Sequence, residues 1–221
     1  MRPPEPMKPH AVIFDMDGLL VDSERIWHIA EDEVFSSRGL DYTDELRASI
    51  IGMRMDEFMA KLSDHFGMQE PLEALTAEVN ANMLRLIPSM VRPQPGAPEL
   101  IDFVQARAWP LAIASSSPLA IIEATLQSQG WDEVFRLRCS ADDVPRGKPA
   151  PDVYLLAARL LGVQPEHCLA LEDSANGARA ATAAGMTCYA VPDRSHSQAA
   201  DLESVTPYVF PDLHAVRAWL T

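Results

Sequence analysis

The sequence has little positive charge and no long hydrophobic run. Its 18 Lys and Arg residues stand against 32 Asp and Glu residues, which gives a formal net charge of −14. Binding to nucleic acid or to an anionic membrane requires clustered cations, so this balance argues against both partners. No apolar run approaches the ~18 residues that a membrane span needs, which argues against an integral membrane protein. Any phosphate-bearing ligand would therefore need a local cationic site.

Cysteines are also scarce. The three that occur, Cys139, Cys168 and Cys188, are odd in number and lack C-x-x-C spacing, so a disulfide framework or a zinc site is not indicated. Buried thiols in a reducing compartment are expected instead, and the cytoplasm is the expected location. The opening segment is Pro-rich without an apolar stretch, and we expect residues 1–9 to form a flexible leader rather than a signal peptide. A monomer is the default expectation.

The apolar pattern changes along the chain. The run 11–14 is short, apolar and partly β-branched, as in strands buried on both faces of a parallel sheet. From 23 to 91, apolar residues recur at helical spacing, and 92–98 then contains three prolines and a glycine. Beyond this break, short apolar runs alternate with helical segments. The predicted strands there are 111–114, 133–139, 168–171, 187–191 and 208–210, and the predicted helices are 119–129, 152–161, 175–184 and 213–220.

Strands that alternate with helices through short links predict an α/β fold, a three-layer, Rossmann-like parallel sheet with helices on both sides. The first strand belongs to this sheet, so the helical block is an insertion after it. We therefore assign residues 1–22 to the core, 23–91 to an inserted four-helix cap and 92–221 to the core again. The two crossings, at 18–23 and 91–96, are a natural hinge.

Polar residues follow the predicted strands at the points where they end. In open parallel sheets, ligands bind at the carboxyl ends of the strands, so the shared position of these residues indicates a site. Lys148 lies in a turn-rich loop that opens the helix predicted at 152–161. The strand-end residues are Asp15, Asp17, Ser115, Ser116, Glu172 and Asp173.

Four of these strand-end residues are carboxylates. Brought together, Asp15, Asp17, Glu172 and Asp173 would repel one another and raise some of their own pKa values, so a cation is expected among them. A donor set of oxygen alone, without His or Cys, favours Mg²⁺ over Ca²⁺ or Zn²⁺. Carboxylate, hydroxyl, lysine and Mg²⁺ together are the groups that phosphoryl transfer requires.

Four motifs carry a family resemblance. FDMDG, the serine after IA in LAIASSS, GKPAPD and LEDS, in this order, resemble the motifs of the haloacid dehalogenase-like (HAD) phosphohydrolases over about residues 12–191. The runs DMDGLLVDSE, IGMR and GKPAPDVY are most similar to the β-phosphoglucomutase-like branch, in particular its hexose- and hexitol-phosphate phosphatases. The resemblance implies an HAD core with a four-helix cap, and a Mg²⁺-dependent phosphatase of a small phosphorylated sugar or sugar alcohol that works through an aspartyl-phosphate.

The resemblance also implies a role for each motif residue. Asp15 would attack the phosphoryl group, and Asp17 would protonate the leaving alkoxide and then deprotonate water. The implied phosphate-binding residues are Ser115, Ser116 and Lys148. The implied Mg²⁺ ligands are Asp15, the backbone carbonyl of Asp17, Glu172 and Asp173.

In the cap, Arg54 resembles the position that grips the far end of the substrate. Mutases of the branch carry a cap histidine, but the matching offset here holds Trp27, with His28 one residue further. One residue on a helix turns a side chain by about 100°, so this favours the phosphatase and makes Trp27 a candidate pocket wall. A β-phosphoglucomutase-type isomerase stays open as an alternative. A non-catalytic phosphosugar-binding regulator is disfavoured because no catalytic motif residue is missing.

Overall fold

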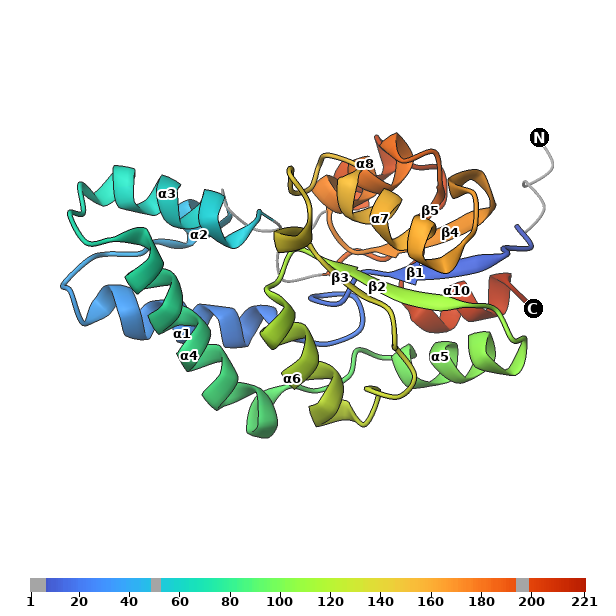
Figure 1. The fold of residues 1–221 in the computed structure, drawn as a ribbon, viewed down its shortest axis with the longest axis horizontal. Coiled ribbons are helices and arrows are strands. Elements are labelled where there is room, and N and C mark those ends of the chain that lie inside the picture. The colour runs from blue at the N-terminus through green and yellow to red at the C-terminus, as the bar shows by residue number, and fades with distance from the viewer. Residues whose placement is uncertain (1–6, 49–52, 194–198) are drawn as a thin grey trace.

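A five-stranded parallel sheet forms the centre of the molecule, with strand order β3-β2-β1-β4-β5 (Figure 1). The computed structural model describes residues 7–48, 53–193 and 199–221. Its strands are β1 (Ala11–Phe14), β2 (Leu111–Ser115), β3 (Arg138–Ser140), β4 (Cys168–Glu172) and β5 (Thr187–Ala190). The chain adds β2 and β3 on one side of β1 and later β4 and β5 on the other. The end of β1 is thus at the change in strand order, where such sheets bind ligands.

Helices cover both faces of the sheet, as the three-layer prediction requires. Val12 and Phe14 face one apolar cluster and Ala11 and Ile13 the other, because neighbouring strand residues point to opposite sides. Burial on both sides explains why this strand is continuously apolar. The first layer contains α5 (Ala97–Ala106), α6 (Leu119–Gln129) and α10 (Leu213–Trp219), and the second contains α7 (Asp152–Leu161), α8 (Ala175–Ala183) and α9 (Ala199–Glu203).

The described part of the chain between the two crossings forms four helices beside the core (Figure 1). They are α1 (Glu24–Ser36), α2 (Asp44–Ala48), α3 (Met55–Phe66) and α4 (Leu72–Met90). The crossings lie side by side: Asp22 N donates to Arg92 O at 2.9 Å, and Gln94 Nε2 donates to Gly18 O at 3.0 Å. The predicted fold class is confirmed, whereas the exact domain boundaries stay a prediction.

Some predicted strands are shorter or absent. A strand was predicted at 133–139, but the observed strand is Arg138–Ser140. The backbone N–H groups of Val134 and Phe135 donate to Trp131 O in a turn. Phe135 is apolar because its ring packs edge-on against Phe14 in the core, with 5.5 Å between ring centroids. The strand predicted at 208–210 reduces to one bridge between Ala190 and Val209.

Other differences concern helices and the leader. The sequence analysis did not predict α5 or α9, since prolines precede the first and the second is short. The predicted leader lies partly outside the described residues. Within it, the backbone N of Met7 donates to the Tyr189 hydroxyl at 3.3 Å, so residue 7 is attached to the core.

Candidate active site

A buried lysine ties two strand ends together. The Lys148 ammonium lies 2.6 Å from Asp15 Oδ1 and 2.7 Å from Glu172 Oε1, and its side chain is 3% exposed. Burial alone would lower the pKa of Lys148, but Asp15 and Glu172 outweigh it and raise that pKa above its ordinary value. The ammonium therefore stays charged beside the carboxylate that the sequence analysis assigns as nucleophile.

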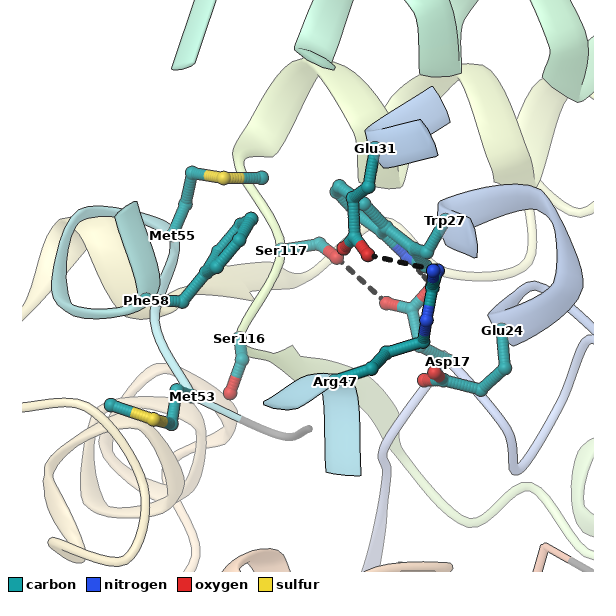
Figure 2. Close-up of a pocket in the computed structure, with 10 residues that line it drawn as sticks. All are labelled: Asp17, Glu24, Trp27, Glu31, Arg47, Met53, Met55, Phe58, Ser116 and Ser117. Carbon is teal, nitrogen blue, oxygen red and sulfur yellow. Dashed lines mark hydrogen bonds and ion pairs between the residues drawn. The ribbon is translucent and has the colours of Figure 1, made fainter. Parts of the chain in front are cut away.

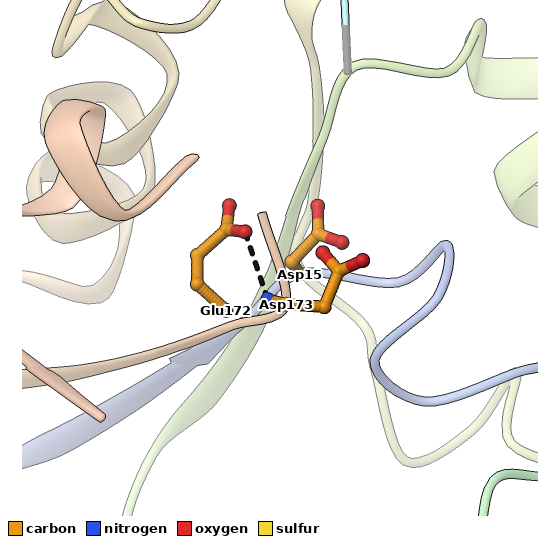
Figure 3. Close-up of side chains that lie close together, drawn as sticks. All are labelled: Asp15, Glu172 and Asp173. Atoms are coloured by element: carbon orange, nitrogen blue, oxygen red, sulfur yellow. Dashed lines mark hydrogen bonds between the residues drawn. The ribbon is translucent and has the colours of Figure 1, made fainter. Parts of the chain in front are cut away.

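Three carboxylates share this buried edge of the sheet (Figure 3). Oxygens of Asp15, Glu172 and Asp173 lie within 4.8 Å of one another. Burial raises the pKa of Asp15 and Asp173 well above the ordinary range, and Glu172 raises both further, while Lys148 lowers them. Three carboxylates beside one ammonium leave a formal charge of −2, which a divalent cation matches. The all-oxygen donor set fits Mg²⁺.

Both oxygens of Glu172 accept hydrogen bonds. Its Oε1 accepts hydrogen bonds from Lys148 Nζ and from the Tyr154 hydroxyl, each at 2.7 Å. Its Oε2 accepts from the backbone N of Asp173 at 3.1 Å and from Ser174 N and Oγ at 3.3 and 3.2 Å. These donors compete with a metal for the lone pairs of Glu172, so Asp15 and Asp173 are better placed as direct ligands.

Two glycines make room for this cluster. Gly18 has φ +76°, and a Cβ there would lie 2.2 Å from Asp173 Oδ2. A Cβ on Gly177, in the first turn of α8, would lie 1.8 Å from Glu172 Oε1. Both distances are far below van der Waals contact, so the carboxylates can hold these positions only against glycine.

Asp17 does not join the carboxylate cluster. The sequence analysis expected four carboxylates to meet, but the side chain of Asp17 faces the cap instead. Its Oδ1 accepts from Ser23 Oγ at 2.7 Å and from Trp27 Nε1 at 3.3 Å, and its Oδ2 accepts from Ser117 Oγ at 2.7 Å. Ser115 Oγ donates to the same oxygen at 3.3 Å. These donors separate its carboxylate from that of Asp15 and hold it at the cap side of the site.

A cavity of about 90 Å³ lies between Asp17 and the cap (Figure 2). Its apolar wall consists of Trp27, Met53, Met55 and Phe58, and its polar wall of Asp17, Glu24, Glu31, Arg47, Ser116 and Ser117. The structure therefore places Trp27 and Ser116 on the pocket, as the sequence analysis expected for a substrate wall and a strand-end serine. Their roles toward a substrate stay predictions.

Arg54, the expected grip on the far end of the substrate, lies outside the described lining of this cavity. Its guanidinium forms an ion pair with Asp56 and donates from Nη1 to Val144 O at 3.1 Å. A Cβ on Gly147 would lie 3.0 Å from Arg54 Cβ, so the Arg54 side chain packs on the Lys148 loop. In this structure Arg54 joins cap to core, and its substrate role stays a prediction.

Glu31 and Arg47 form an ion pair on the cap wall. Arg47 Nη1 lies 3.5 Å from Glu31 Oε2, and both side chains are buried. Arg47 Nη2 also donates to Asp32 Oδ1 at 2.6 Å, and the guanidinium lies 4.3 Å from the Tyr42 ring centroid. Burial raises the pKa of Glu31 to about 7, although the neighbouring Tyr42 hydroxyl and Arg47 lower it.

The sequence analysis missed these cap residues and Tyr154. A signal existed for Glu31, which stands four residues after Trp27 and thus on the same helix face. Tyr154 stands in the quoted run GKPAPDVY, where it shares a loop-to-helix segment with Lys148. No local pattern marks Arg47, because only the packing of α2 against α1 brings it to the pocket.

Comparisons with known proteins agree with this geometry. The model of the haloacid dehalogenase-like hydrolase family matches residues 12–191. Hexitol phosphatase B of Escherichia coli is 36% identical over 189 residues, which cover 82% of this chain and 83% of that protein. A putative β-phosphoglucomutase from Thermotoga maritima has a similar structure, with a TM-score of 0.73, 31% identity and coverage of 94% of this chain and 97% of that one.

A third similar structure is CbbY from Rhodobacter sphaeroides, a mutant solved with xylulose-(1,5)bisphosphate. It has a TM-score of 0.82 and 27% identity, and the match covers 93% of this chain and 95% of that one. Among the residues that the structure describes, no helix combines the length and the hydrophobicity of a membrane-spanning segment. The predicted family and its β-phosphoglucomutase-like branch are confirmed, and the expected class of phosphoric monoester hydrolase is consistent with relatives named as phosphatases. The chain belongs to the haloacid dehalogenase-like hydrolase family.

Proposed function

We propose that the protein is a Mg²⁺-dependent phosphatase that hydrolyses the monophosphate of a small sugar or sugar alcohol through an aspartyl-phosphate. The observation that carries the proposal is the contact between Lys148 and Asp15, buried at the end of β1 beside two further carboxylates. Relatives named for phosphorylated carbohydrates and for hexitols support the substrate class. The cytoplasm and a monomeric state remain expectations.

In the proposed first step, Asp15 attacks the phosphorus atom and the bond from phosphorus to the leaving oxygen breaks. The positive charge of Lys148 offsets the negative charges of Asp15 and the phosphoryl oxygens, so the Asp15 carboxylate can approach the phosphate anion. Ser115 and Ser116 would donate to the phosphoryl oxygens. Mg²⁺, held by Asp15, Asp173 and the Asp17 carbonyl, would neutralise phosphoryl charge when bound.

Asp17 then acts as the general acid that protonates the leaving alkoxide. Its carboxylate lies between the phosphoryl site and the cavity, where the alkoxide departs, so it can deliver a proton there. In the second step it takes a proton from water as the water attacks the phosphorus atom. The bond between phosphorus and the Asp15 oxygen then breaks, which releases phosphate and regenerates the Asp15 carboxylate. The hydrogen bonds from Ser23, Trp27 and Ser117 fix its orientation for both transfers.

Replacement of Asp17 by asparagine tests this assignment. We expect Asp17→Asn to lower kcat for an alkyl phosphate about 100- to 10,000-fold, the usual size of general acid–base catalysis. The loss should be smaller for p-nitrophenyl phosphate, whose leaving group needs little protonation. Titration calorimetry should still detect Mg²⁺ binding, because the Asp17 side chain lies outside the carboxylate cluster. Equal losses on both substrates would argue against a proton-transfer role.

A phosphate-release screen tests the function itself. Sugar, polyol and glycolate phosphates would be incubated with the protein in the presence of Mg²⁺ or of a chelator. We expect release from sugar or polyol monophosphates and its loss with the chelator. The mutase alternative predicts little release and instead interconversion of hexose phosphate isomers when a bisphosphate primer is added. In the structure, Trp27 lines the cavity and His28 is not among its described lining residues, which favours the phosphatase.

A further inference from the structure

The inner wall of the cavity is polar but poor in cations. Among the described lining residues, Asp17, Glu24 and Glu31 carry carboxylates, and Arg47 carries the one positive charge. That charge is already shared, because Arg47 lies 3.5 Å from Glu31 Oε2 and 2.6 Å from Asp32 Oδ1. A second phosphate or a carboxylate on the substrate would therefore meet net negative charge at this wall.

The same wall offers both kinds of hydrogen-bonding group at close range. Glu31 is 6% exposed, and its Oε2 is paired with Arg47 only at 3.5 Å, longer than a direct hydrogen bond. A ligand hydroxyl placed between Glu31 and Arg47 could therefore add a short hydrogen bond to this buried oxygen. Figure 2 shows this oxygen and the Arg47 guanidinium beside Trp27, in the cavity that Asp17 borders.

A hydroxyl group matches this arrangement. It can donate to the Glu31 carboxylate and accept from the Arg47 guanidinium at once, without adding charge to the pocket. The face of Trp27 supplies an apolar surface for the C–H groups of a carbohydrate chain. An anionic group could use only Arg47, and above about pH 7, where Glu31 is mostly ionised, Glu31 would repel it.

We propose that Glu31 and Arg47 select substrates whose leaving group is a neutral polyol, and that they discriminate against substrates with a second anionic group. The inference rests on the proposed phosphatase function and narrows its substrate class. It assigns the recognition of the far end of the substrate to this pair rather than to Arg54, which is bonded to Asp56 and Val144. The proposed substrate, with one phosphate, also differs from the bisphosphate that is bound in the similar CbbY structure.

The test compares substrate preference in four forms of the protein. Wild type, Glu31→Gln, Arg47→Lys and the control Glu33→Gln would be assayed with sorbitol 6-phosphate, phosphoglycolate, fructose 1,6-bisphosphate and p-nitrophenyl phosphate. Glu33 lies on the same helix but is exposed and pairs with Arg85 away from the cavity. Thermal unfolding of each variant would show that the fold is kept.

We expect wild type to favour sorbitol 6-phosphate over the two doubly anionic substrates in kcat/KM. In Glu31→Gln and Arg47→Lys, kcat/KM for sorbitol 6-phosphate should fall about tenfold or more further than for p-nitrophenyl phosphate. Gln offers the polyol only a neutral acceptor, and Lys lacks the planar set of guanidinium donors. Glu31→Gln should also raise the relative use of phosphoglycolate, and Glu33→Gln should change no ratio.

Two results would overturn the inference while leaving the phosphatase intact: a wild-type preference for the bisphosphate, or kcat/KM ratios between substrates that stay unchanged in both folded variants, whether or not all activities fall together. Absence of hydrolysis of all four substrates by wild type with Mg²⁺ would instead reject the proposed function, and the selectivity inference with it. The two failures are therefore distinguishable.

Discussion

Replacement of Asp15 by asparagine is expected to reduce phosphate release at least about a thousandfold. The neutral amide is a poor nucleophile, so the aspartyl-phosphate would not form. The shape and the contact with Lys148 can be kept, because the amide oxygen can accept the hydrogen bond that Asp15 Oδ1 accepts at 2.6 Å. Phosphate release from the best substrate of the screen is the measurement.

The same substitution should leave the fold intact. Asp15 is one of three carboxylates within 4.8 Å, and its removal relieves repulsion that Lys148 alone does not balance. In metal-free buffer the melting temperature of Asp15→Asn should therefore equal or exceed that of wild type, and added Mg²⁺ should raise it less than in wild type. Asp22→Asn, an exposed change on the same loop, should behave as wild type in both assays. An inactive and unfolded Asp15→Asn would contradict this account.

Replacement of Lys148 by methionine is expected to remove activity and also to destabilise the protein. The sequence analysis gave Lys148 a role in phosphate binding, and the structure adds that it bridges two buried carboxylates, Asp15 and Glu172. Removal of one partner from a buried ion pair typically costs about 3–5 kcal/mol. We expect a loss of this size in the free energy of unfolding in metal-free buffer, measured with urea.

Added Mg²⁺ should recover part of the stability lost in Lys148→Met but none of the catalysis. A divalent cation can replace the missing charge among the carboxylates, yet it cannot bring an ammonium to Asp15 and the phosphoryl oxygens. Lys8→Met is the matched control. Lys8 is exposed and lies near the start of the chain, so its replacement should alter neither stability nor activity. Full activity in folded Lys148→Met would remove the lysine from the proposed mechanism.

The sequence pattern predicted correctly the buried first strand and the helix ends, because each depends on residues that are close together in the chain. The run 11–14 is apolar at every position because both its faces are buried, and the helix ending at Gly162 has its glycine in the left-handed conformation that ends helices. The segment around Phe135 misled the prediction. A core residue in a turn and a core residue in a strand look alike in sequence, and only the contact with Phe14 distinguishes them.

For the site, the order of the four motifs and their strand-end positions placed Asp15, Lys148, Glu172 and Asp173 in one cluster, because the carboxyl ends of parallel strands meet at one edge. The sequence alone thus determined the family, the fold class and this buried centre. Tertiary structure decided the rest. Asp17 turns from the cluster toward the cap, and Arg47 instead of Arg54 lines the cavity, since these outcomes depend on how the cap helices pack against one another and the core. Such packing brings together residues whose spacing in the chain carries no periodic signal.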